Sequence, residues 1–361
     1  MTTLGAHGAV AATAVTKTAF GKLPDGTAID VYTLKNAELE VRITNYGARI
    51  VSLLTKDRDG RMGDVVLGYN SVEEYVAEEV SKTYVGAIVG RYGNRIRNGK
   101  FSIDGHEYQI PLNNGANALH GGPHGFDDQT WAVRELPDGV EMSLVSKDGD
   151  MGFPGTLTLH VRYTLAGSAL HIHYAATTDK TTVVNVTNHA YFNLAGDGSG
   201  TILDEVMQIN ADEYTPVDAG LIPVGGAKPV AGTPFDFNKP TVIGARINEP
   251  NEQLKFGGGY DHNWILRGKP GEMKVAARVY DPKSGRVLTE STTEPGVQFY
   301  SGNAIPGLYK GKTGVVYGKY AGFCLETQHY PDSPNHPAFP STELKPGATY
   351  HTTTVYSFSA R

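Results

Sequence analysis

One acidic residue stands where an apolar strand would normally exclude it. Glu326 lies in "GFCLETQHY", between aliphatic and aromatic residues, and a loop rich in proline follows. A carboxylate that points into a core is costly unless it is paired or does chemistry. The alternation of side chains along a strand places Cys324, Glu326 and Gln328 on one face. We interpret Glu326 as a general base, with a structural ion pair as the alternative.

A histidine in a second apolar stretch is the natural partner for such a base. In "TTVVNVTNHAYFNLAG" the strand pattern points Val183, Asn185, Thr187 and His189 to one side, which makes that face unusually polar. An imidazole titrates near neutral pH and therefore suits a general acid. We interpret His189 as that acid, and a buried, hydrogen-bonded histidine is the alternative.

Five further polar residues lie beside glycines or aromatic residues and could bind a neutral, hydroxyl-rich ligand. They are Asn94 and Arg95 in "GRYGNRI", His120 in "LHGG", Asp261 in "YDHN" and Gln298 in "VQFY". A guanidinium is a fixed fork of donors, and glycine lets a ligand or another backbone approach closely. The alternatives are a basic turn, a solvated loop histidine and an Asx-turn that opens a strand.

Two other motifs are weaker indications of a binding site. Arg91 and Arg97 flank the same glycines as Arg95, but their spacing is not that of a phosphate-binding loop. In "HIH", His171 and His173 share one face of a strand, which is how a metal-binding pair would be placed. No third ligand follows at short spacing, so we prefer a cross-strand surface pair.

The elements that must position these residues are short strands. Apolar and polar residues alternate with period two, rich in Val, Thr and Tyr, over residues 39–46, 155–165, 169–177, 274–281 and 350–360. Asp104-Gly105 predicts a hairpin. Ser71 followed by Glu74 forms a capping box, which predicts one short helix over 70–80. Many short strands with few helices predict an all-β sandwich with large sheets and a cleft on one of them.

Length and composition limit the class of protein. The chain has 361 residues, 40% of them hydrophobic and 19% charged, which allows a large core. An all-β domain of about 250 residues is common, so we expect a flexible arm over residues 1–15 and a single domain over 16–361. The net charge of −6, with basic residues thinly spread, argues against a nucleic-acid partner.

Cysteine use and the N-terminus bear on location. Cys324 is the single cysteine, so no internal disulfide can form, which suits a reducing compartment. No apolar run is long enough for a membrane helix, and the N-terminus lacks the basic and apolar regions of an export signal. We therefore expect a cytoplasmic protein, with a periplasmic one as the alternative if the N-terminal arm remains from a trimmed precursor.

Taken together, these motifs resemble those of the aldose 1-epimerases, or galactose mutarotases. The matching stretches are "NYGARIVSL", "GDVVLGY", "VGAIVGRYGNRI", "LHGGPHGFD", "VTNHAYFNLAG", "YDHNWIL", "GVQFYSGN" and "GFCLETQHYPDSPNHPAFPSTEL". They occur in the family's order from about residue 16 to the C-terminus. The resemblance implies a galactose mutarotase-like β-sandwich, exchange between the α and β anomers of free hexoses such as galactose and glucose, and no metal or organic cofactor.

The resemblance also implies a role for each candidate. It makes Glu326 the general base and His189 the general acid, and it makes Asn94, Arg95, His120, Asp261 and Gln298 contacts to the sugar. We expect Glu326 to be ionised and His189 to be protonated, because their mutual attraction favours both charges. The partner is a small aldose, and we expect a monomer or a homodimer.

Three other functions share some of these features. A glycoside hydrolase needs two carboxylates about 5–10 Å apart, and Asp261 with Glu326 would be the pair. A carbohydrate-binding module needs the sugar contacts but no acid–base pair. An epimerase of phosphorylated sugars needs a cluster of Arg or Lys at the rim of the cleft.

Overall fold

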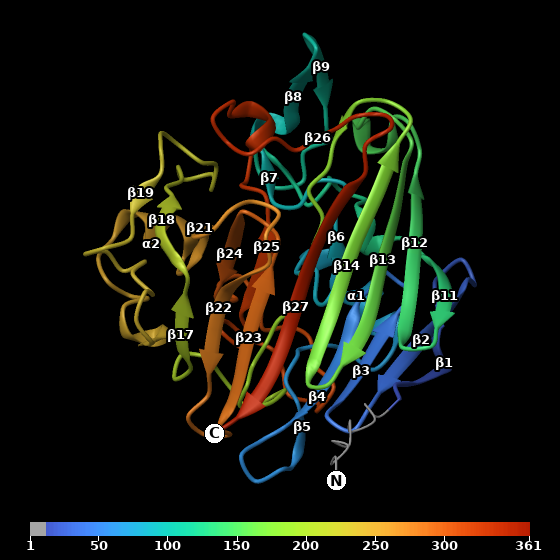
Figure 1. Ribbon diagram of the computed structural model, residues 1–361, viewed down its shortest axis with the longest axis vertical. Coiled ribbons are helices and arrows are strands. Elements are labelled where there is room, and N and C mark those ends of the chain that lie inside the picture. The colour runs from blue at the N-terminus through green and yellow to red at the C-terminus, as the bar shows by residue number, and fades with distance from the viewer. Residues whose placement is uncertain (1–11) are drawn as a thin grey trace, which may run out of the picture.

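The largest unit of the fold is a nine-stranded antiparallel sheet, which fans across the front of Figure 1. The computed structural model describes residues 12–361. In spatial order the strands are β11 (Ala132–Leu136), β12 (Gly139–Ser146), β13 (Leu157–Ala166), β14 (Ala169–Thr178), β27 (Tyr350–Ala360), β23 (Arg286–Thr292), β22 (Lys274–Tyr280), β17 (Val206–Ile209) and β20 (Thr241–Val242).

Two five-stranded sheets lie behind the large sheet (Figure 1). The first contains β1 (Ala14–Lys22), β2 (Ala28–Lys35), β3 (Leu39–Thr44), β4 (Ile50–Lys56) and β5 (Met62–Asp64). The second runs in the order β19 (Lys228–Pro229), β18 (Ala211–Thr215), β21 (Asp261–Leu266), β24 (Gly296–Tyr300) and β25 (Cys324–Gln328).

The smaller elements connect these sheets. The paired short strands are β6 (Ile88–Val89) with β16 (Thr187–Asn188), β7 (Arg95–Ile96) with β10 (Ala118–Leu119), β8 (Lys100–Ile103) with β9 (His106–Gln109), and β15 (Thr182–Val183) with β26 (Glu343–Leu344). The helices are α1 (Val72–Glu78) and α2 (Glu252–Gly257). Both are short; the sequence predicts α1 but not α2.

The alternating patterns form half-buried strands. Along β13, Leu159 and Val161 are fully buried, whereas His160 and Arg162 point to solvent. Apolar side chains from all three sheets meet in one continuous core, to which the second five-stranded sheet contributes Trp264, Phe299 and Leu325. This packing of sheets face to face is the predicted β-sandwich.

The local predictions for the turn and the helix are confirmed. Asp104 and Gly105 form the turn between β8 and β9, both with positive φ. The Ser71 side chain caps α1 by accepting a hydrogen bond from the Glu74 backbone N–H, as a capping box requires.

The stretch before His189 differs from its prediction. In place of one strand, the chain forms β15 and β16 with an irregular segment between them. The Asn185 amide breaks the strand, because it donates to the carbonyls of Gly93 and His329 and accepts from the His329 N–H. His189 follows β16 directly, and both faces of this stretch are buried, so its polar side is not a solvent face.

The segment that carries His189 also covers the outer edge of β25. Phe192 and Phe323 exchange two backbone hydrogen bonds of 2.7 and 2.9 Å there. The predicted arm over residues 1–15 falls mostly outside the described residues, and Ala14 and Val15 already belong to β1. No helix within residues 12–361 is long and apolar enough to cross a membrane.

Candidate active site

A cleft of about 450 Å³ opens over the second five-stranded sheet, and six of the seven predicted site residues line it. They are Asn94, Arg95, His120, His189, Asp261 and Glu326. These residues come from segments far apart in the sequence, which the fold brings to one face of β21, β24 and β25. A volume of this size lies within the range of pockets that bind small molecules.

The alternation along β25 places Glu326 on the floor of the cleft. Leu325 packs into the core, while Cys324 and Glu326 point to the opposite face, as the sequence predicts. Glu326 is 2% exposed, so solvent reaches it only through the cleft. Its Oε2 is buried and has no hydrogen-bond partner among the described residues.

His189 lies opposite Glu326. Its Nε2 is 3.8 Å from Oε1 of Glu326, and its Nδ1 is 3.4 Å from the Sγ of Cys324. The rings of His120, Tyr191 and Tyr84 surround it at centroid distances of 5.2, 5.1 and 5.8 Å. The imidazole and the carboxyl therefore stand close enough to contact two oxygens of one small ligand.

The expected charges of this pair are wrong for the cleft without a ligand. Burial raises the pKa of Glu326 well above its usual value, with a further contribution from the nearby charge of Asp261. Burial also lowers the pKa of His189 to about 4. Loss of hydration thus outweighs the mutual attraction that the sequence prediction relied on, and it favours the uncharged form of both groups.

His120 is held in one tautomer by its neighbours. The Asn94 backbone N–H donates to Nδ1 of His120 at 3.0 Å, and burial holds the pKa of His120 well below 6.5. The neutral ring therefore carries its proton on Nε2 and can donate it. The residue after His120 must be a glycine for a structural reason: a Cβ at Gly121 would lie 2.1 Å from the Gly90 carbonyl oxygen.

Arg95, Asp261 and Gln298 form a connected group at one side of the cleft. The Gln298 Nε2 donates to Oδ1 of Asp261 at 2.7 Å, and a guanidinium nitrogen of Arg95 lies 3.8 Å from Oδ2 of Asp261. Arg95 Nε also donates to Asn114 at 3.0 Å. Gln298 is 3% exposed and does not line the cleft, although its Oε1 is free among the described residues.

Three of these residues could be considered as metal ligands. His120, His189 and Glu326 each offer one ligand atom, all within 4.8 Å of one another. A metal-bound histidine must present a lone pair, however, and the Asn94 N–H already occupies Nδ1 of His120. The tautomer of His120 therefore fits a hydrogen-bond donor better than a metal ligand.

Sequence reasoning did not assign several residues of the cleft. Tyr84, Tyr191 and Tyr300 form its aromatic walls, and Asn114 supports Arg95. Two of them could have been found from their positions in the strands. Tyr300 pairs with Cys324 in register, and Tyr191 lies two residues after His189. Tyr84 lies in an irregular segment with positive φ, which no strand pattern predicts.

The other two arginines of the basic turn lie outside the cleft. Arg91 is buried and donates to the carbonyls of Pro154 and Gly155, both at 2.8 Å. Arg97 lies near the surface, 3.5 Å from Asp218. Arg91 and Arg97 are therefore residues of a basic turn, the alternative given above, and Arg95 alone of the three arginines reaches the cleft.

A sheet-lined cleft with a buried carboxyl, a nearby imidazole and several polar side chains in a β-sandwich fits an enzyme that acts on a small polar ligand. Comparison with known proteins makes the class specific. The Aldose 1-epimerase family model matches residues 30–357. The chain is 47% identical over 346 residues to the galactose mutarotase of Sus scrofa, covering 96% of this chain and 98% of that protein. It is 41% identical over 342 residues to the aldose 1-epimerase of Escherichia coli (strain K12), covering 93% and 97%.

A solved structure agrees with this result. The galactose 1-epimerase from Lactobacillus acidophilus NCFM superposes with a TM-score of 0.82 at 32% identity, covering 96% of this chain and 99% of that one. The chain therefore belongs to the aldose 1-epimerase family, and it is an isomerase.

Proposed function

We propose that this enzyme interconverts the α and β anomers of free hexoses such as galactose and glucose. The observation that carries the proposal is the pair formed by Glu326 Oε1 and His189 Nε2, 3.8 Å apart on the floor of a cleft that a hexose can enter. Opening a pyranose requires removal of a proton from the anomeric hydroxyl and delivery of one to the ring oxygen. An acid and a base acting together avoid a high-energy charged intermediate.

The pair shares one transferable proton and holds the same number of protons in its neutral and its ionic form. A neutral carboxyl with a neutral imidazole contains as many protons as a carboxylate with an imidazolium. Transfer of one proton from Glu326 to Nε2 of His189 therefore produces the ionic form without uptake from solvent. In that transfer Nδ1 of His189 keeps its hydrogen and donates it to the Cys324 sulfur, which lies 3.4 Å away.

The reaction then proceeds in three steps. The Glu326 carboxylate takes the proton of the anomeric hydroxyl while His189 gives its Nε2 proton to the ring oxygen, so the ring bond breaks and an aldehyde forms. The aldehyde carbon rotates by about half a turn. The ring oxygen attacks its other face, Glu326 returns a proton to the carbonyl oxygen and His189 recovers one. No net proton is consumed.

The remaining residues hold the rest of the sugar still during that rotation. His120 donates from Nε2, Asp261 accepts from hydroxyls, and Asn94 and Arg95 donate to sugar oxygens. Gln298 lies beneath the cleft and orients Asp261 through its Nε2. Such positioning lowers the entropic part of the barrier. The chain supplies both proton-transfer groups itself, so we propose that no metal or organic cofactor takes part.

The test is polarimetry of freshly dissolved α-galactose and α-glucose with the purified protein. We expect the rotation to reach equilibrium faster than without enzyme, and we expect no release of nitrophenol from nitrophenyl glycosides. Release of nitrophenol without faster mutarotation would instead identify a glycoside hydrolase. Sugar binding with neither activity would identify a carbohydrate-binding module.

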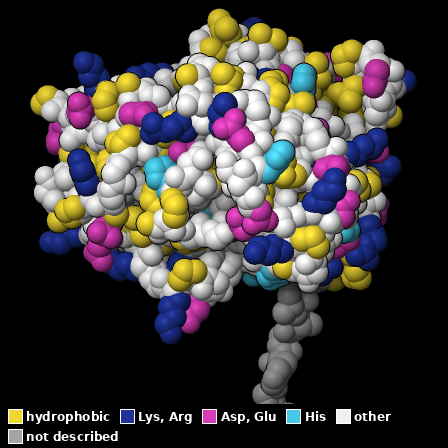
Figure 2. Space-filling view, turned by 90° about the horizontal axis from the view of Figure 1, so that it is seen from above, with side chains coloured by type: hydrophobic (Ala, Val, Ile, Leu, Met, Phe, Trp, Pro, Cys, Tyr) yellow, Lys and Arg dark blue, Asp and Glu magenta, His cyan; other side chains and the backbone are white. Residues whose placement is uncertain are grey.

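Other expectations follow from the same features. We propose that residues 16–361 form a single domain, which the core shared by three sheets supports. We also propose a cytoplasmic monomer or homodimer without a nucleic-acid partner. Acidic and basic side chains are interspersed on the face shown in Figure 2, which supports the last point. Sedimentation of the purified chain and fractionation of cells test these proposals.

A further inference from the structure

A group of histidines lies on the outer face of the nine-stranded sheet, away from the cleft. His171 and His173 point to solvent from β14, and their register partners Val355 and Thr353 lie on β27. His351, also on β27, lies opposite Ala175 and therefore diagonal to His173. The sequence placed His171 and His173 on one face, and the fold adds the third histidine that the sequence could not locate.

The rings of His171 and His173 lie side by side on the outer face of the sheet. They are stacked with their centroids 6.0 Å apart and their planes inclined by 21°. Nδ1 of His173 forms a 3.1 Å hydrogen bond with the Thr353 hydroxyl, so Nε2 is the nitrogen of His173 that is available to an ion. Both side chains are half-buried, so their stems are held by the sheet while their outer edges reach solvent.

We propose that His171 and His173, with His351 as an additional ligand, bind a divalent transition-metal ion such as Cu²⁺ on the outer face of the sheet. Imidazole bonds to such ions are about 2.0–2.1 Å long, which requires the two nitrogens to approach within about 4 Å. The ring centroids are 6.0 Å apart, so the proposal requires rotations about χ1 and χ2 of both side chains on binding. Cu²⁺ is the strongest binder among the divalent first-row metals, so it is the most sensitive probe.

The titratable neighbours of the group are Arg162 and His351, which add positive charge beside His173, and His160, which lies opposite Ala175 on β13. Burial lowers the pKa of both His171 and His173, so their lone pairs are available at neutral pH. The nearest cation on the adjacent strand is Arg162, and it is paired with Glu141 at 3.1 Å. Histidine binds metal in its neutral form, so affinity is expected to fall as the pH decreases toward 5.

The experiment is calorimetric titration of the full chain with copper sulfate in a non-chelating buffer, together with the electron paramagnetic resonance spectrum of the bound ion. We expect saturable binding with nitrogen hyperfine structure, and at least tenfold weaker binding in the double variant His171→Asn/His173→Asn. His351→Asn is expected to weaken binding less. His124→Asn, which removes an exposed histidine elsewhere, is the matched control and is expected to bind as the wild type does.

The result that overturns the proposal is equal copper binding by the double variant and the wild type, or no saturable binding by the wild type. Binding that disappears in His189→Asn but persists in the double variant would place the ion in the cleft and would equally overturn it. The double variant is expected to keep its anomer exchange rate, which confirms that it is folded. Because binding is measured without activity, its outcome is independent of the proposed function.

Discussion

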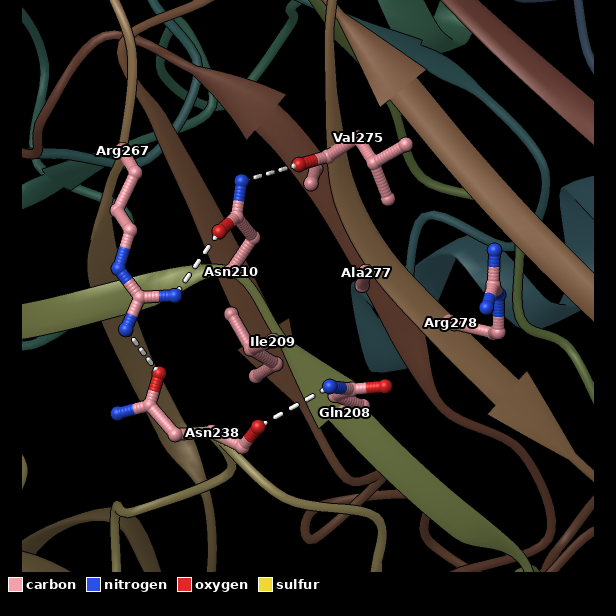
Figure 3. A pocket seen from close by; sticks show the side chains of 9 residues that line it. Gln208, Ile209, Asn210, Asn238, Arg267, Val275, Ala277 and Arg278 are labelled. Atoms are coloured by element: carbon pink, nitrogen blue, oxygen red, sulfur yellow. Dashed lines mark hydrogen bonds between the residues drawn. The ribbon is translucent and has the colours of Figure 1, made fainter.

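Two hollows of this molecule are similar in size and differ in chemistry. The cleft of about 450 Å³ contains Glu326 and His189, whereas a groove of about 320 Å³ lies over β17 and β22 (Figure 3). In the groove the polar side chains bind one another: Arg267 donates to Asn210 and Asn238, and Asn210 donates to the Val275 carbonyl. Their hydrogen-bonding capacity is largely used.

In the cleft the supporting bonds leave the reactive atoms free. Asn94 occupies the inner nitrogen of His120, Gln298 occupies one oxygen of Asp261, and Cys324 contacts the inner nitrogen of His189. Each of these bonds orients a side chain without consuming the atom that faces the ligand. A hollow alone therefore does not indicate a site; free polar atoms that are held in place do.

Among variants of the cleft and the groove, Glu326→Gln is expected to lower the rate of anomer exchange the most. It removes the base with little change of shape, so anomer exchange should slow by about 10²–10⁴-fold. Polarimetry with α-galactose measures the loss, and a change below tenfold would show that Glu326 is not the base.

His189→Asn is expected to slow exchange by about 10²-fold, toward the lower end of the same range. The ring oxygen can still receive a proton from water in the open cleft, so some exchange should persist. The measurement is kcat by polarimetry, with KM expected to change less than kcat. An effect on KM alone would assign His189 to binding.

A smaller effect is expected at Cys324. Valine has a similar size but accepts no hydrogen bond from Nδ1 of His189, so Cys324→Val should lower kcat by about tenfold, a loss typical of one removed hydrogen bond. Serine keeps an acceptor, and Cys324→Ser should recover most of the rate. Equal losses in the two variants would indicate packing rather than orientation of His189.

The pH dependence of stability should also differ between the regions. Below about pH 4 Glu326 carries its proton in both the folded and the unfolded chain, since its usual pKa is about 4.3. As the pH rises, the unfolded chain loses this proton first, so the wild type loses stability by about 1.4 kcal/mol per pH unit until the raised pKa is passed. Glu326→Gln lacks this loss and should melt at a higher temperature than the wild type at pH 7, but not at pH 4.

The smallest effect is expected in the groove. Asn210→Ala removes hydrogen bonds to Arg267 and Val275 but no group that reaches a sugar. Anomer exchange should stay within twofold of the wild type, whereas thermal stability should fall slightly. A large loss of activity with unchanged stability would break the comparison and assign the groove a role in turnover.

The sequence predicts most of the strands and six residues that line the cleft, but not the tyrosines of the cleft or its electrostatics. Alternation along β13 and β25 is a local property, so the inward and outward sides of Leu325 and Glu326 can be derived from the printed residues. The charge of Glu326 cannot, because it depends on burial by segments more than a hundred residues away. The interruption of the predicted strand at Asn185 also depends on distant partners, the carbonyls of Gly93 and His329.

The segment that carries His189 and lies along the edge of β25 links the catalytic activity of the protein to its solubility. The segment from Asn185 to Phe192 carries His189 and also binds the backbone of Phe323 and His329, the residues that flank β25. It thereby lies along a strand edge that could otherwise pair with a strand from another molecule. If that segment detaches, His189 moves away from Glu326, and the edge of the sheet at β25 becomes exposed in the same event. Loss of turnover on heating and the onset of turbidity should therefore share one midpoint.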